Sequence, residues 1–495
     1  MNWPLKTALV AFVVCSGCTV GRKYQQPTVP ATPTFKELAG NDEWKVATPS
    51  DELIKGKWWE MFGDPELNRL EEMVEINNQN VKQAEAQFRV ARALVNLNRA
   101  NYYPTIGANG SITQTDSGGA GGRGGGTSQS FSIGGNASWE PDLWGRVRLS
   151  VENAVANAQV SAADLENARL SAQALLAADY FLLIANDMQQ AILRETIEAY
   201  TRNLQLTTNR YNGGVASKSD ITLAQTSLAD AQASFTDLHI ARSQQEHAIA
   251  VLTGQAPAGF SIPVGSIKGP PPSIPLSLPS ALLERRPDIA ANERLVAASN
   301  ASVGLAQTAY YPTLTLSANA GLANSSLVNL FTYASRVWSA GPSITQTIYD
   351  FGRRKAQVQG ALAQYDSTVA VYRQSVLAAF QEVEDDLASL RYLAEEAVQQ
   401  RVAVEAAQQS LVLEMARYRA GTDSYLNVIT TQTIELNDRQ QSVTILQRRM
   451  LAAVDLVKAL GGGWDSSTLP TLEQLRSAEL ADPNNTQKVA QPANK

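Results

Sequence analysis

The residues able to carry out catalysis or bind a metal are few in this chain, and their spacing suits neither purpose. The 495 residues include two histidines, His239 and His247, eight positions apart on a segment predicted to be helical. A pair of ligands on one helix face needs a spacing of three or four residues. The patterns H-E-x-x-H, G-x-S-x-G and G-x-x-x-x-G-K-[ST] are also missing from the sequence. We therefore expect no enzymatic activity and no cofactor or metal, and we interpret the histidines as surface or interface residues.

Both cysteines, Cys15 and Cys18, lie near the start of the chain. The apolar run 8–14 has the length of a signal-peptide core and is too short to span a membrane. Two small residues precede Cys18, as at a bacterial lipoprotein cleavage site, so we expect a signal peptide over 1–17 and a lipid on Cys18. Thr19 follows in place of an inner-membrane retention aspartate, which favours delivery to the outer membrane. The alternative is a signal that leaves a free thiol.

Charge and composition exclude several further classes of protein. The net charge is −6, from 41 basic and 47 acidic residues, and nucleic-acid-binding proteins normally carry a basic patch. No stretch approaches the ~20 apolar residues of a membrane-spanning helix. The glycine-rich segment 118–126 lacks the lysine and the following helix of a phosphate-binding loop, so it is predicted to be a surface hairpin loop.

The chain is a tandem duplication, and this decides the predicted architecture. Four ordered matches share an offset of 207 or 208 residues: Tyr102–Thr105 with Tyr310–Thr313, Asp142–Arg146 with Asp350–Arg353, Arg210–Gly214 with Arg417–Gly421, and Gln225–Thr226 with Gln432–Thr433. Each half is predicted to contain a helix, two strands, a very long helix, a glycine-containing turn and a second long helix. The first helices, near 65–101 and 287–309, end at a Tyr-Pro pair because proline cannot continue a helix.

The predicted strands alternate between apolar and polar residues, which indicates two different faces. They lie near 105–114, 130–139, 313–322 and 336–348, each about the length of a tilted strand that crosses a bilayer. The alternative, a soluble sandwich, does not account for the helices that follow. The proline-free segment 142–210 would reach about 100 Å as one helix. A second long helix carries apolar residues at a spacing of seven, typical of a coiled-coil seam: Val369, Val376, Val383, Leu390, Ala397, Val404 and Leu411.

Four strands cannot close a barrel, and lipid does not tolerate open sheet edges. Closure must therefore come from several copies. Three chains would give twelve strands and room for a water-filled lumen, whereas two would give eight strands around a filled interior.

Several motifs resemble those of the TolC family of outer-membrane efflux proteins, and of its lipoprotein branch typified by OprM. The resemblance covers about 19–470 and rests on these segments: Trp58–Leu67, Asp142–Arg146, Leu283–Ile289, Asp350–Arg354 and Ala379–Asp385. It implies an α+β membrane protein, a homotrimer with a twelve-stranded transmembrane β-barrel continued by a long periplasmic α-helical barrel. It also implies a passive exit duct for drugs or small molecules, partnered by a periplasmic adaptor and an inner-membrane RND-type pump. Export of proteins or of metal ions remains the alternative. A periplasmic spacer would not explain the strands, and an adaptor would not show two equivalent strand pairs.

The resemblance also implies an organisation into segments, including an equatorial belt around the helices. The expected segments are a signal peptide (1–17), a lipid anchor and N-terminal equatorial segment (18–64), the first repeat (65–254), a proline-rich equatorial linker (255–280), the second repeat (281–461), and a C-terminal equatorial segment with a disordered tail (462–495).

The functional residues implied are those of a gate and a docking tip at the two helix–turn–helix ends. Leu426 falls where relatives place an apolar constriction, and Asp423 and Asp220 would form a negative ring, although tip aspartates are also ordinary helix caps. Relatives often have an aspartate and an arginine where this chain has Thr430 and Thr433, which argues against the family's ionic gate here. The expected docking residues are Tyr211, Gly213, Gly214, Arg417, Tyr418 and Gly421. The three glycines are predicted to permit left-handed turns.

Overall fold

The computed structural model describes residues 20–29, 35–38, 56–116, 126–274 and 285–477. The expected signal peptide, the lipid-bearing Cys18 and the tail from 478 lie outside these residues, as does most of the glycine-rich segment.

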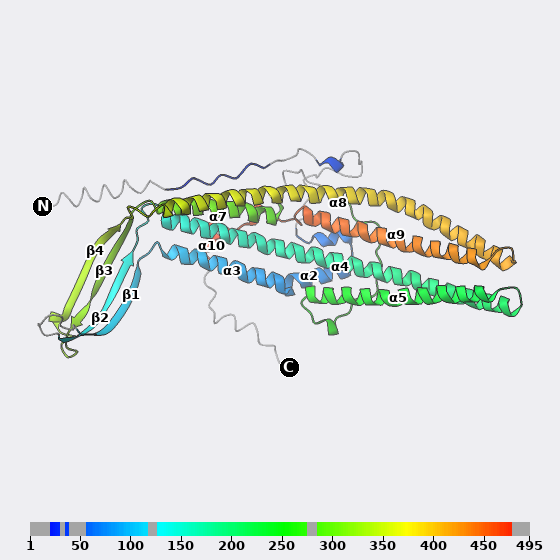
Figure 1. Cartoon of the computed structure of the whole chain (residues 1–495), viewed down its shortest axis with the longest axis horizontal. Coiled ribbons are helices and arrows are strands. Elements are labelled where there is room, and N and C mark those ends of the chain that lie inside the picture. Colours follow the sequence, from blue (N-terminus) through cyan, green and yellow to red (C-terminus); the bar gives the residue numbers. More distant parts are fainter. Residues whose placement is uncertain (1–19, 30–34, 39–55, 117–125, 275–284, 478–495) are drawn as a thin grey trace.

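The chain is long and thin, with a four-stranded sheet at one end and two helical hairpins reaching to the other (Figure 1). The first repeat contains α2 (Pro65–Asn77), α3 (Gln79–Ala100), β1 (Thr105–Asp116), β2 (Thr127–Trp139), α4 (Arg146–Asn212) and α5 (Lys218–Leu252). The second contains α7 (Pro287–Thr308), β3 (Thr313–Asn324), β4 (Arg336–Thr345), α8 (Arg353–Ala420) and α9 (Tyr425–Ala459). The predicted order of elements is confirmed in both halves.

The first predicted helix is wrong in one respect, because the chain breaks it at Asn78. This residue leaves the helical conformation (φ −59°, ψ 125°), and its side chain accepts hydrogen bonds from the N–H groups of Asn80 and Val81. Asparagine is a strong helix N-cap, so it begins a new helix there.

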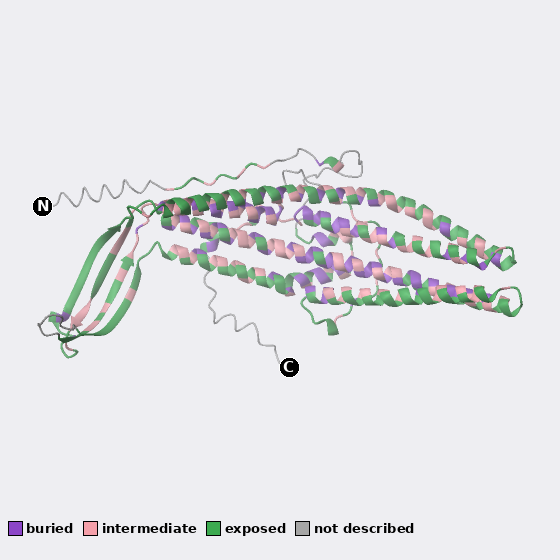
Figure 2. Cartoon of the chain, in the orientation of Figure 1, coloured by how far each residue is buried: buried purple, intermediate pink, exposed green. Residues whose placement is uncertain are grey.

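The strand register puts all four apolar sets on one face of the sheet. The strands pair antiparallel in the order β1-β2-β3-β4. Phe131 lies opposite Ile112, and Leu314 opposite Ile344. The other face pairs Ser111 with Ser132, whose hydroxyl oxygens lie 2.8 Å apart. The apolar face is largely exposed in the single chain (Figure 2), as expected of a surface that meets lipid.

The helices form a two-layered rod in which α4 and α8 run the full length. α3 and α5 lie along α4, and α7 and α9 lie between α4 and α8 (Figure 1). One 18-residue window of α4 is apolar enough to span a bilayer, contrary to the sequence expectation, but 56% of it is buried against neighbouring helices. It therefore forms the core of the rod. Three positions of the predicted heptad seam are also buried: Val376, Val383 and Leu390.

Two end-to-end helix joints lie near the middle of the rod and are equivalent in the two repeats. At the first, the Asn78 amide donates to the carbonyl oxygen of Leu252, the last residue of α5, at 2.9 Å. At the second, Arg286 Nη1 donates to the carbonyl oxygen of Ala459, the last residue of α9, at 3.1 Å. A left-handed glycine, Gly254 or Gly461, follows each helix end.

No side chain fits at these glycines. A Cβ would lie 2.6 Å from the Asn77 carbonyl oxygen at the first joint and 2.0 Å from that of Arg285 at the second. The duplication is therefore visible in three dimensions as well as in sequence.

Candidate functional site

The tip of the rod is made by the turn between α4 and α5 and the turn between α8 and α9. Gly214 (φ +75°) and Gly421 (φ +80°) adopt the left-handed conformation that was predicted. The same prediction is wrong for Gly213, whose φ of −81° is open to any residue. Its N–H donates to the Asn209 carbonyl, so it ends α4 as a normal helix terminus.

The two tip aspartates both cap the helices that follow them. Asp220 forms a capping box with Ser217, with backbone-to-side-chain distances of 3.0 and 3.1 Å. Asp423 Oδ1 accepts from the Ser424 N–H and from the Asn427 amide, both at 2.7 Å. These hydrogen bonds lower the pKa of Asp423, so its carboxylate stays ionised. Each aspartate thus has a structural role, and a charged ring at the trimer axis would be an additional one.

Leu426 lies in the first turn of α9 with its side chain pointing away from the hairpin. It is 58% exposed, whereas Tyr425 and Val428 beside it are buried. Within one chain, Leu426 therefore does not serve as a packing residue between tip helices. The Thr430 and Thr433 hydroxyls donate to carbonyl oxygens of their own helix, those of Leu426 and Ile429, each at 3.0 Å.

Tyr418 joins the two hairpins and is not an exposed docking residue. It is only 3% exposed, its ring lies 5.1 Å from that of Tyr425, and its hydroxyl lies 3.4 Å from Thr207 Oγ1 on α4. Arg210, near the end of α4, places its guanidinium 4.7 Å from the centre of the Tyr418 ring. It also donates to the carbonyl oxygen of Arg419 at 3.0 Å. A cation over an aromatic face, combined with a bond to a helix C-terminus, fastens one hairpin to the other.

Of the other expected docking residues, Tyr211 and Arg417 are exposed. Arg417 pairs with Glu414 at 2.9 Å. The sequence analysis missed Arg210 as a contact between hairpins. It begins the repeated segment Arg210–Gly214, but only the meeting of the two tips reveals its partners.

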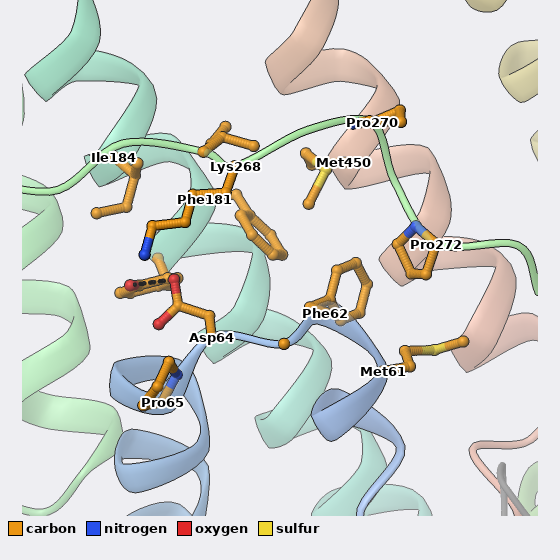
Figure 3. Close-up of a pocket in the computed structure, with 13 residues that line it drawn as sticks. Met61, Phe62, Asp64, Pro65, Phe181, Ile184, Lys268, Pro270, Pro272 and Met450 are labelled. Atoms are coloured by element: carbon orange, nitrogen blue, oxygen red, sulfur yellow. Dashed lines mark hydrogen bonds between the residues drawn. The ribbon is translucent and has the colours of Figure 1, made fainter.

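A cavity of about 300 Å³ lies beside the middle of α4, where the chain before α2 meets the linker that follows α5 (Figure 3). Asp64 caps α2 by accepting from the Glu66 and Leu67 N–H groups, and it also accepts from the Tyr180 hydroxyl at 2.8 Å. Phe62 and Phe181 form an aromatic wall, with ring centres 5.1 Å apart. The amine of Lys268 reaches into the cavity toward Asp64 (Figure 3). Because Asp64 already caps a helix, this arrangement holds the belt in place and offers no free catalytic group.

The same linker is fixed to the rod by a buried ion pair. Asp187 on α4 accepts from Arg242 Nε on α5 at 2.6 Å and from the Gly265 N–H at 3.1 Å. Arg242 in turn donates to the Ile262 carbonyl at 2.8 Å.

The joint between α9 and α7 carries a cluster of charged groups. Arg286 binds Glu382 on α8 at 2.6 Å and Asp288 at 2.8 Å. Asp386 and Asp455 line the same cavity, of about 490 Å³. Burial, followed by repulsion from Asp455 and two further carboxylates of α8, raises the pKa of Asp386 to about 7.

Comparison with known proteins gives this geometry its context. The sequence matches the family described as outer membrane efflux protein over residues 70–255 and 278–462, which are the two repeats. The chain belongs to the outer membrane efflux protein family.

Members of this family resemble the chain along almost its whole length. It is 31% identical to the probable efflux pump outer membrane protein TtgC of Pseudomonas putida, over 94% of this chain and 96% of the relative. It is 31% identical to the pyoverdine export outer membrane protein OpmQ of Pseudomonas aeruginosa, over 88% and 93%. The solved outer-membrane channel OprN matches with a TM-score of 0.84 and 29% identity, over 90% of this chain and all of that one. The Campylobacter jejuni CmeC channel shares the fold at 22% identity, with a TM-score of 0.82 over 91% and 96%.

The chain is thus an outer-membrane component of an efflux system with the fold of the TolC-like channels. The family assignment agrees with the arrangement of the described residues, where the functional features are turns, caps and hairpin contacts. His239 and His247 are exposed on α5. In the described part of the chain, no group of three or more potential ligands could hold a metal ion.

Proposed function

We propose that the chain is the exit duct of a tripartite efflux pump, assembled as a homotrimer and acting without enzymatic activity. Small organic molecules would enter it from an inner-membrane RND-type transporter through a periplasmic adaptor. The observation that carries the proposal is the polarity of the molecule along its length. A sheet with an exposed apolar face lies at one end, and two hairpin tips lie at the other (Figure 2).

The trimer is supported by the edges of the sheet. β1 and β4 are the edge strands, and an open edge in lipid would leave backbone N–H and C=O groups without partners. Three copies supply twelve strands, enough to surround a water-filled lumen. The polar face that includes Ser111 and Ser132 would line this lumen.

The tip would serve as both gate and adaptor-docking site. Three exposed Leu426 side chains near the axis would form an apolar constriction that excludes water and hydrated solutes. Asp423 and Asp220 would surround it with negative charge and favour cations. Tyr211, Arg417 and the turns at Gly214 and Gly421 are accessible for an adaptor.

A lipid on Cys18 would anchor the N-terminal segment beside the barrel in the outer membrane. The segment that follows reaches the rod, since the Lys36 and Glu37 N–H groups donate to the Glu384 carboxylate at 2.7 and 3.0 Å. Anchor and barrel would therefore hold the duct at the membrane independently.

The proposed substrates follow from the relatives, which are named for the efflux of toluene, antibiotics and solvents and for pyoverdine export. These are small organic molecules. Metal ions and secreted proteins are the competing cargoes, and no residue of the tip favours either.

Imaging of the purified full chain in detergent tests the architecture. We expect a threefold tube about 130–140 Å long, from ~100 Å of helix and ~30 Å of membrane barrel. Particles without threefold symmetry would contradict the proposal.

Deletion of the gene in its own host tests the cargo. We expect greater accumulation of organic dyes and antibiotics, restored by the intact gene. Sensitivity to metal salts alone, or loss of a secreted protein alone, would assign the duct to one of the competing cargoes.

A further inference from the structure

An aromatic contact joins the two repeats just below the sheet. The indole Nε1 of Trp144, in the turn between β2 and α4, donates to the Pro312 carbonyl oxygen at 2.7 Å. Its ring also stacks on Tyr311, with centres 5.0 Å apart and planes 27° apart. The turn that follows the first strand pair is therefore seated on the turn that precedes the second pair.

The equivalent contact from the second repeat has no partner within the chain. Phe351 lies 207 residues after Trp144, and Tyr103 and Pro104 lie 208 residues before Tyr311 and Pro312. Phe351 is 90% exposed and Tyr103 is 69% exposed. Among the described residues, Phe351 is also the only non-glycine with a positive φ, 54°. A bulky residue rarely adopts this conformation unless surrounding contacts hold it.

Contacts within each repeat show that equivalent positions can be compared at this level. Trp139 Nε1 donates to the Tyr102 carbonyl oxygen at 3.0 Å, and Gln346 Nε2, 207 residues on, donates to that of Tyr310 at 3.1 Å. The strand registers agree as well. Thr105 pairs with Ser138 in the first repeat, and their counterparts Thr313 and Thr345 pair in the second.

We infer that Phe351 of one copy docks on the Tyr103–Pro104 turn of the next copy, head to tail, and that this contact sets the strand register that closes the barrel. The occupant of the exposed turn is thus a second copy of this chain. The inference rests on the proposed trimer and adds to it a specific contact and register.

The register follows from the pairing of β2 with β3 inside the chain. Asn136 lies opposite Asn319. The residue 207 positions after Asn136 is Ser343 on β4, and the residue 208 positions before Asn319 is Ser111 on β1. Ser343 of one copy should therefore lie opposite Ser111 of the next.

Side-chain polarity supports this register independently of the aromatic contact. It places Pro342 opposite Ile112, so the apolar faces of neighbouring copies continue into each other. A shift of one residue would place Ile112 opposite a polar-face residue of β4 and interrupt the apolar face. A shift of two would preserve the faces but would move Phe351 away from Tyr103. The aromatic contact is therefore what selects among the registers that polarity allows.

Paired cysteines in the full chain test the register. With Ser343→Cys and Ser111→Cys together, mild oxidation should link neighbouring copies into covalent dimers and trimers, because directly opposite Cβ atoms lie about 4.5–5.5 Å apart. The matched control combines Ser343→Cys with Thr113→Cys, two residues away on the same face, where the diagonal distance is about 7–8 Å. The unmodified chain, which has only Cys15 and Cys18, corrects for background links.

Alanine substitutions test the aromatic contact. Phe351→Ala should raise the trimer dissociation constant in detergent about 3- to 10-fold, as expected for one aromatic pair. Adding Tyr103→Ala should then have little further effect. Phe331→Ala removes an equally exposed phenylalanine in the loop between β3 and β4 and should leave the constant unchanged.

The outcomes separate the inference from the proposed function. A threefold assembly that forms links preferentially through the control pair, or forms none, overturns the register. Equal effects of Phe351→Ala and Phe331→Ala overturn the contact. If no trimer forms at all, both the inference and the proposed trimer fail.

Discussion

Replacing Asp386 with asparagine should remove a pH-dependent weakness at the joint between α9 and α7. The charged groups that face this carboxyl come from three elements: Glu382 and Asp385 on α8, Asp455 and Lys458 on α9, and Arg286 and Asp288 at the start of α7. α4 contributes the uncharged Asn167 and Ser171. Carboxylates outnumber cations here, so the local charge opposes ionisation of Asp386.

The direction of the effect follows from the pKa, which rises from 3.8 to about 7 in the folded chain. Both the folded and unfolded states carry the proton below about pH 4, where the folded state has no penalty. As the pH rises toward 7, the unfolded state releases the proton more readily, and stability falls. A shift of this size corresponds to about 4 kcal/mol at full burial. Because Asp386 is only partly buried, we expect about 1–2 kcal/mol after solvent screening.

Unfolding of the detergent-purified protein, followed by loss of helical circular dichroism, checks this at pH 4.5 and pH 7.5. Asp386→Asn should stabilise the protein by about 1–2 kcal/mol at pH 7.5 and should have little effect at pH 4.5. Asp385→Asn, an exposed neighbour on the same helix, is the control and should change stability by much less. An equal effect of Asp386→Asn at both pH values, or a loss of stability at pH 7.5, would refute the reasoning.

Three further expectations concern the gate, the barrel and the anchor. Leu426→Ser should raise single-channel conductance in planar bilayers without lowering trimer stability; reduced stability at unchanged conductance would identify a packing residue instead. Ile112→Arg on the apolar face should cost about 2–4 kcal/mol near the bilayer midplane, whereas Ser111→Arg on the opposite face should be mild in a refolding titration, and equal costs would reverse the orientation of the sheet. Labelled palmitate should be incorporated into the full chain and lost in Cys18→Ala, and labelling that persists would exclude Cys18 as the lipid site.

Features encoded locally were predictable, and those that depend on distant contacts were not. Strand alternation and the 207–208-residue offset gave the four strands and their faces, because the period of two is carried by neighbouring residues. Asn78 was missed as a helix break because the surrounding composition remains helical, and the cap is visible only in its hydrogen bonds. Glycine at 213 was overinterpreted, since one left-handed residue per turn is enough.

The tip residues show the same limit. Tyr418 was assigned to a docking surface from its place near a turn, yet it is buried because the other hairpin covers it. Arg210 gained its role from the Tyr418 ring and the Arg419 carbonyl, more than 200 positions away in the chain. No local pattern encodes such a contact.

The two end-to-end joints have a mechanical consequence. In each repeat one helix, α4 or α8, passes the middle of the rod unbroken, while its neighbour is divided there, at Asn78 or at Arg286 (Figure 1). The lower segments, α5 and α9, are thus attached to the upper ones by a few hydrogen bonds in place of a continuous backbone helix. Torque applied at the tip can be absorbed as bending at these joints before it reaches the strands. The fold thereby isolates the membrane end from the moving end, as a flexible coupling isolates one shaft from another.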